Sequence, residues 1–135
     1  MKVNFVIRGE PRGKERPRFY NKRAYTPQKT KEYENKVKTG YILQCPKGYF
    51  GTCPIKAKMT AFYPIPESWS KSKKARAIQG EVVPTVKPDC DNVIKAILDS
   101  LNGVAYKDDN QVIEINFIKK YSLKKDARIE VELCD

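Results

Sequence analysis

Four segments of the chain alternate apolar and polar residues with a period of two, and this pattern restricts the fold to one built on a β-sheet. The segments are residues 2–9, 55–63, 111–121 and 128–133. Successive side chains of a strand point to opposite faces, so each segment presents one apolar face. We expect residues 124–126 to form a hairpin turn between the last two strands. The apolar positions are Val3, Phe5 and Ile7; Ile55, Ala57, Met59 and Ala61; Ile113, Ile115 and Phe117; and Ile129, Val131 and Leu133.

Two longer segments carry apolar residues at the spacing of a helix. The first spans residues 26–44, with Thr26 as its N-cap and Pro27 in its first turn. The second spans residues 91–102 and ends at Gly103. The side chains expected on the buried faces are Tyr33, Val37 and Tyr41 in the first helix, and Val93, Ile94, Ile97, Leu98 and Leu101 in the second.

The remaining segments complete a single domain. Residues 70–79 favour a short helix that Ser70 or Ser72 can cap, and residues 10–25, with two prolines and a glycine, favour a loop. The expected order is β-α-β-α-α-β-β. This order predicts one mixed α/β domain over residues 1–135, with a mixed sheet of about four strands, two long helices and one short helix.

The charge of the chain indicates a polyanionic partner. Lys and Arg number 27 against 16 Asp and Glu, which gives a net charge of +11. Nucleic acid fits such a surplus best, although basic residues that serve only solubility are the alternative. No apolar run is long enough to span a bilayer or to form a signal peptide, so we expect a cytoplasmic protein.

The absence of histidine narrows the chemistry. It excludes His-dependent catalytic triads, and the four cysteines form no C-x-x-C pair, so zinc sites of the usual kinds are excluded too. Reduced thiols are expected in a cytosolic chain. Any hydrolysis by this chain must therefore depend on carboxylates, lysines or a bound metal ion.

An acidic and basic stripe lies on the second long helix. Asp89 and Asp91 flank Cys90 where the helix begins, and two carboxylates aimed at one place favour a bound Mg²⁺. Lys95 lies one turn after Asp91 and can offset charge that develops on a phosphate. Asp99 is about 12 Å from Asp91 by helical rise, too far to share one ion with it, and is expected to orient Lys95 or to cap a packing contact.

A second acidic group precedes the long third strand. Asp108 and Asp109 lie there, and one of them can supply a third carboxylate if that strand lies beside the start of the helix. Each motif also has a structural interpretation. The Asp89–Asp91 group can be a helix cap, the Asp108–Asp109 pair a turn, and the Asp91–Lys95 pair a surface ion pair.

Basic residues elsewhere are candidates for DNA contact. The segment 10–25 interleaves them with Phe19 and Tyr20, a composition that can follow a phosphate backbone and stack on bases. A solvated loop or helix is the alternative for each basic segment. The candidates are Lys14, Arg16, Arg18, Lys73, Lys74, Lys87 and Lys107.

These motifs together resemble the RusA family of Holliday-junction resolvases, many of them encoded by phages or prophages. Lys14-x-Arg16-Pro17-Arg18-Phe19 with Tyr25-Thr26-Pro27 is also similar to the amino-terminal part of phage members. The main block reads Lys87-Pro88-Asp89-x-Asp91-Asn92-x-x-Lys95-Ala96-x-x-Asp99-x-Leu101-Asn102-Gly103, followed by Tyr106-Lys107-Asp108-Asp109-x-Gln111-Val112.

The resemblance implies a homodimer that binds four-way DNA junctions in recombination and repair and cuts two strands symmetrically. It implies Mg²⁺, with Mn²⁺ as a substitute, held by Asp89, Asp91 and Asp109, with Asp108 as the alternative third ligand. Lys95 is the implied essential lysine. The number of metal ions stays open. Two other functions remain as alternatives: a non-catalytic module that binds branched DNA, and a nuclease for other branched or flapped DNA.

Overall fold

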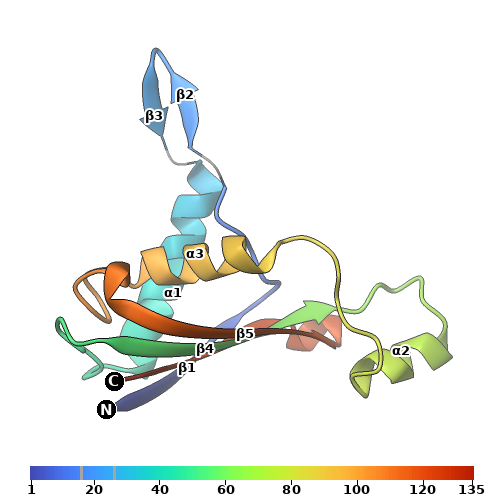
Figure 1. The fold of residues 1–135 in the computed structure, drawn as a ribbon. Coiled ribbons are helices and arrows are strands. Elements are labelled where there is room, and N and C mark those ends of the chain that lie inside the picture. The colour runs from blue at the N-terminus through green and yellow to red at the C-terminus, as the bar shows by residue number, and fades with distance from the viewer. Residues whose placement is uncertain (16, 26) are drawn as a thin grey trace.

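The computed structural model describes residues 1–15, 17–25 and 27–135, and it is a mixed α/β domain as expected (Figure 1). Thr26, the expected N-cap of the first helix, and Arg16 lie outside the described residues. The strands are β1 (Lys2–Arg8), β2 (Arg18–Tyr20), β3 (Arg23–Tyr25), β4 (Ile55–Pro64), β5 (Val112–Ser122) and β6 (Arg128–Cys134). The helices are α1 (Gln28–Gln44), α2 (Lys71–Ile78) and α3 (Cys90–Ser100), with 3-10 turns η1 (Asp109–Gln111) and η2 (Lys124–Asp126).

The main sheet has four strands in the order β1-β6-β4-β5. Strand β6 is antiparallel to both β1 and β4, whereas β5 is parallel to β4. The expected hairpin turn at residues 124–126 is therefore wrong, because β5 and β6 are not neighbours. The chain leaves β4 through α2 and α3 and returns as a parallel strand, as a helical crossover requires. It then passes through η2 and crosses β4 to reach β6.

Helices α1 and α3 pack together on one face of this sheet, as Figure 1 shows. Neighbouring strands align apolar side chains on that face: Phe5 opposes Val131, and Met59 lies between Val131 and Phe117. On β4 the alternate residues Lys56 and Lys58 are exposed on the other face. The expected core faces of β1, β4, β6, α1 and α3 are thus confirmed.

Strand β5 departs from the expected pattern. Ile113 and Ile115 are 66% and 42% exposed, although Ile115 is in register with the buried Ala57. Strand β5 is the edge of the sheet; it contacts β4 extensively, and α2 and α3 over small areas. An apolar stripe at a sheet edge is therefore left without cover.

Residues 18–25 form a hairpin where a loop was expected. Strands β2 and β3 pair with each other in a separate two-stranded sheet that projects from the body (Figure 1). Asn21 and Lys22 both have positive φ, +49° and +64°, the conformation of the tightest hairpin turns. The Asn-Lys pair is a weaker signal for such a turn than Asn-Gly, which explains the error.

The helix ends follow their sequence signals closely. The Ser70 side chain accepts a hydrogen bond from the Lys73 amide and so caps α2, as one of the two expected caps. Helix α3 begins one residue earlier than expected and ends at Ser100, and Gly103 adopts a left-handed φ of +76° just beyond it. Among the described helices, none is long and apolar enough to cross a membrane.

Candidate active site

The start of α3 presents two carboxylates that the helix itself does not use. Asp89 occupies the N-cap position with extended backbone, yet its side chain makes no capping hydrogen bond. Asp91 lies in the first turn, and both residues are exposed. A helix N-terminus favours negative charge, but a capping aspartate would normally accept an amide hydrogen bond. The simple cap interpretation of Asp89 therefore fails, and both carboxylates are free to bind a ligand.

Lys95 is held on the same face of α3 by Asp99. The Lys95 Nζ lies 3.4 Å from a carboxylate oxygen of Asp99, one turn further along, so Asp99 is placed for the first of its two expected roles, the orientation of Lys95. The Lys95 side chain stays 62% exposed while that of Asp99 is 19% exposed. Lys95 is thus restrained through its ammonium group and still accessible to a substrate phosphate.

Lys14 reaches the same carboxylate from the amino-terminal segment. Its Nζ lies 3.1 Å from Asp99 and 2.6 Å from Glu34 of α1, and its backbone amide donates to the Asn92 carbonyl. The side chain is only 20% exposed. Lys14, which we expected to contact DNA, pairs with Glu34 and Asp99 in this structure and so links α1 to α3.

Asp109 joins this network from the other side. Its amide donates to the side-chain oxygen of Asn102 at 2.8 Å, and its carboxyl shares a hydrogen bond with that of Asp99. Burial, the hydrogen bonds with Asp99 and Asp108, and their negative charges raise the pKa of Asp109 to about 6. Burial also opposes the ionisation of Asp99, but hydrogen bonds from Asp109 and Lys14 and the charges of both lysines outweigh it and lower the Asp99 pKa.

Asp108, the alternative third ligand, caps the 3-10 turn η1. Its side chain accepts a hydrogen bond from the Asn110 amide, and its own amide donates to the Gln111 side chain. This is a capping box, and it fixes the start of η1. Asp109 is the member of the pair that faces α3.

The structure brings the expected site residues together only in part. Lys95 and Asp109 both contact Asp99. Asp91 lies about 12 Å from Asp99 by helical rise, and Asp89 is further away at the N-cap of the helix. Within the described part of the chain, no three acidic or cysteine side chains are close enough to hold one ion. The donors are carboxylate oxygens, which Mg²⁺ prefers, so their chemistry fits the metal although their present positions do not complete a site.

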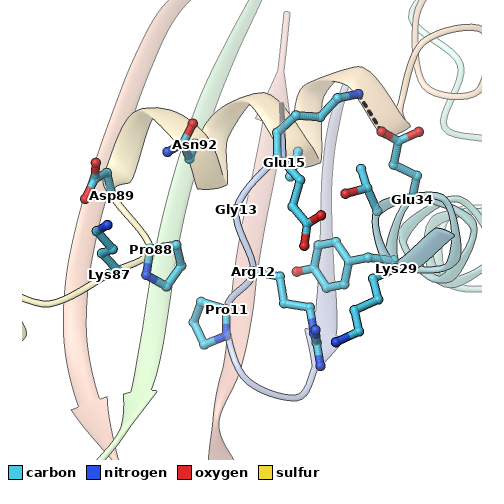
Figure 2. Close-up of a pocket in the computed structure, with 14 residues that line it drawn as sticks. Pro11, Arg12, Gly13, Glu15, Lys29, Glu34, Lys87, Pro88, Asp89 and Asn92 are labelled. Atoms are coloured by element: carbon cyan, nitrogen blue, oxygen red, sulfur yellow. Dashed lines mark hydrogen bonds and ion pairs between the residues drawn. The ribbon is translucent and has the colours of Figure 1, made fainter. Parts of the chain in front are cut away.

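A pocket of about 560 Å³ adjoins the start of α3, and no sequence pattern predicted it. In Figure 2, Lys87, Pro88, Asp89 and Asn92 lie along one side of it, and Lys29 and Glu34 of α1 lie along the other. The peptide bond between Lys87 and Pro88 is cis. The Tyr63 hydroxyl donates to the Pro88 carbonyl at 2.6 Å and anchors this segment to the end of β4.

The other candidate DNA contacts are spread over the surface. Arg18, on the hairpin, is 3.9 Å from Glu15 and largely exposed. Lys73 of α2 lies over the Trp69 ring at 3.9 Å. Lys87 and Lys107 are exposed near opposite ends of α3, and Lys74 is half-buried.

Two comparisons bear on this arrangement. The family model described as endodeoxyribonuclease RusA matches residues 8–134. A protein of Bacillus subtilis (strain 168), named "Uncharacterized protein YqaN", is 35% identical over an alignment of 135 positions that covers 96% of this chain and 93% of that protein. The family match includes the amino-terminal segment, α3 and η1, and therefore all the candidate site residues.

Proposed function

The chain belongs to the RusA endodeoxyribonuclease family, and we propose that it is a Mg²⁺-dependent nuclease that resolves four-way DNA junctions by hydrolysing phosphodiester bonds. The observation that carries the proposal is the exposed polar face of α3. It combines two carboxylates that serve no capping role with a restrained, accessible lysine. The net charge of +11 supports a nucleic-acid substrate.

Asp89, Asp91 and Asp109 are the residues that would hold Mg²⁺. The chemistry that Mg²⁺ supplies when bound is Lewis-acid assistance to phosphodiester hydrolysis. Burial and the neighbouring carboxylates of Asp99 and Asp108 raise the pKa of Asp109, and a divalent cation relieves the repulsion between such carboxylates. One or two ions are compatible with three carboxylates.

The chain's own residues supply the rest of the site. Lys95 would contact the non-bridging oxygens of the phosphate that is cut and stabilise the negative charge that develops there. Asp99 positions Lys95, and Lys14 positions Asp99. Because cleavage of a four-way junction needs two related cuts, we also propose a homodimer with two-fold symmetry.

The test is cleavage of a synthetic four-way junction with Mg²⁺, comparing the wild type with Asp91→Asn. We expect the substitution to abolish cutting while junction binding persists. Glu130→Gln is the matched control, because Glu130 lies on the helix-free face of the sheet and loses a carboxylate charge in the same way. An Asp91→Asn variant that cuts like the wild type would contradict the assignment.

The same assay separates the other candidate functions. Because no three acidic side chains converge in the described residues of one chain, a non-catalytic junction-binding module deserves a direct comparison. Such a module would bind junctions equally well and cut none of them with Mg²⁺ or Mn²⁺. A panel with flaps, forks and three-way junctions identifies a nuclease whose main substrate is another branched DNA.

A further inference from the structure

The pocket beside Asp89 has the position of a substrate subsite. It lies between α1 and the start of α3, and residues 11–15 also line it. Gly13 packs so closely there that a Cβ atom would lie 2.9 Å from the Asn92 side chain. Its volume of about 560 Å³ falls in the range of roughly 300–1,000 Å³ that is usual for ligand pockets.

The lining of the pocket carries a small excess of positive charge, with Arg12, Lys14, Lys29 and Lys87 against Glu15, Glu34 and Asp89. Arg12, Lys29 and Lys87 line it, all three are exposed, and none has an ion-pair partner among the residues that the structure describes. The side chains of Arg12 and Lys29 extend to the same side of the pocket, while Lys87 approaches from the α3 side (Figure 2). Groups of this kind bind the phosphates of a DNA backbone.

Two buried hydroxyls in the wall lack partners. Thr30 and Tyr33 of α1 are 5% and 8% exposed, and neither hydroxyl makes a hydrogen bond to any described group. The Arg12 backbone approaches the Tyr33 hydroxyl without completing a hydrogen bond. Buried polar groups are nearly always paired, and leaving them unpaired is destabilising. Each hydroxyl oxygen has less than 1 Å² of accessible surface, so a polar ligand in the pocket would supply the missing partners as the Thr30 and Tyr33 side chains shift toward it.

We propose that this pocket binds one nucleotide of the DNA substrate next to the phosphate that is cut, and that Thr30 and Tyr33 select its base. Arg12, Lys29 and Lys87 contact the flanking phosphates, and the two hydroxyls hydrogen-bond to the base edge. The base must leave its stack to enter, which costs least where pairing is already disturbed, as at a branch point. This inference rests on the proposed function, because it places the subsite beside a cleavage centre.

The first test measures cleavage of a junction panel in which each base near the branch is varied in turn. We expect the wild type to prefer one base at one position. Tyr33→Phe and Thr30→Val remove a hydroxyl with little change in shape, and each should reduce that preference about twofold to tenfold. Neither should lower the melting temperature, since each removes an unpaired buried group. Tyr49→Phe, an exposed tyrosine outside the pocket, is the control and should keep the preference.

The second measurement does not need cleavage. A junction with 2-aminopurine at successive positions beside the branch, bound without Mg²⁺, should show a fluorescence increase at one position as the base unstacks. The Thr30→Val/Tyr33→Phe double variant should show a smaller increase.

The two measurements separate the inference from the proposed function. Absence of cleavage by the wild type on every junction would overturn the proposed function. The fluorescence measurement would then test by itself whether the pocket binds an unstacked base. Cleavage with a base preference that Tyr33→Phe and Thr30→Val retain would overturn the pocket assignment and leave the nuclease. Absence of a fluorescence increase at every position would overturn it as well.

Discussion

Asp99 connects the residues of the candidate site, although it is not itself among the proposed metal ligands. Its carboxylate contacts Lys95, Lys14 and Asp109, which come from three different parts of the chain. An exposed lysine held by one ion pair samples fewer orientations than a free one, so Asp99 should matter for catalysis through Lys95.

We expect Asp99→Asn to slow single-turnover cleavage by roughly tenfold to a hundredfold, because Lys95 loses its orienting charge. Junction affinity in a gel-shift titration should change little, since Asp99 is mostly buried and does not contact the substrate. Lys95→Ala should slow cleavage at least as much. An Asp99→Asn variant with wild-type cleavage rates would show that Lys95 needs no positioning.

Asp109 should make the metal-free protein less stable at neutral pH. Its pKa is about 6 in the folded chain, above the value of about 3.9 expected when unfolded. The folded state therefore binds more protons between these values, and stability falls as pH rises through this window. Asp109→Asn should raise the melting temperature at pH 7.5, and the gain should shrink as pH is lowered toward 4.

Magnesium supplies the control for this measurement. If Asp109 binds the ion, Mg²⁺ should stabilise the wild type more than Asp109→Asn and so reduce the difference at pH 7.5. A substitution that lowers the melting temperature at pH 7.5 would contradict the crowding of Asp109 with Asp99.

At the residue scale, the sequence identifies the candidate catalytic residues better than the residues that contact and position them. Asp89, Asp91, Lys95 and Asp109 stand out by type and spacing, and the i,i+4 spacing also predicts the Lys95–Asp99 contact. The partnership of Lys14 with Glu34, and the unpaired hydroxyls of Thr30 and Tyr33, depend on how α1 packs on α3. No local pattern encodes that packing.

The hairpin of β2 and β3 projects from the body of the domain and exposes aromatic side chains (Figure 1). Phe19 and Tyr20 are 74% and 73% exposed, and Arg18, Lys22 and Arg23 lie beside them. Exposed aromatic and basic side chains on a projecting arm suit stacking on bases and contact with phosphates.

Replacing Phe19 and Tyr20 together by Ala should weaken junction binding by about tenfold or more, from the usual value of base stacking. The melting temperature should stay within a degree or two, because neither side chain contributes to the core. Fluorescence anisotropy with a labelled junction measures the affinity. Tyr49→Ala, also exposed, is the matched control. Unchanged affinity would leave the hairpin as a solvated surface feature.

At the element scale, the sequence predicts the four strands of the main sheet but not which of them are neighbours, and it misses β2 and β3. A period of two identifies the core face of β6, but it does not show which strands pair with each other. The pairing follows from the crossover through α2 and α3, which makes β5 parallel to β4 and separates it from β6. Residues 124–126 have the composition of a hairpin turn, but they lie in the connection that passes β4 and joins β5 to β6.

At the scale of the whole molecule, one apolar surface of the chain is left exposed to solvent. Strand β5 is a long edge strand, and Ile113, Ile115 and Ile118 on it are 66%, 42% and 45% exposed. Long apolar edges promote association unless they are covered. The proposed two-fold nuclease needs a self-complementary surface, and this edge is the candidate that the fold offers.

We therefore expect the protein to be a dimer at micromolar concentration by light scattering, with β5 in the interface. Ile113→Lys places a charge near the start of β5, on its most exposed isoleucine, and should shift the protein toward the monomer while its melting profile remains cooperative. The monomer should nick junctions singly, since paired cuts require two sites held together. Leu43→Lys is the control, because Leu43 is 76% exposed on α1 and its substitution adds the same charge.

The two variants also locate the interface if β5 is not part of it. A dimer that survives Ile113→Lys but dissociates with Leu43→Lys would place the contact on α1, and a wild-type monomer would remove the two-fold arrangement altogether. The salt dependence of binding gives a second readout, because the slope of log affinity against log salt counts phosphate contacts. A dimer on a junction should show a steeper slope than the Ile113→Lys monomer, since two copies of the basic surface then contact one substrate.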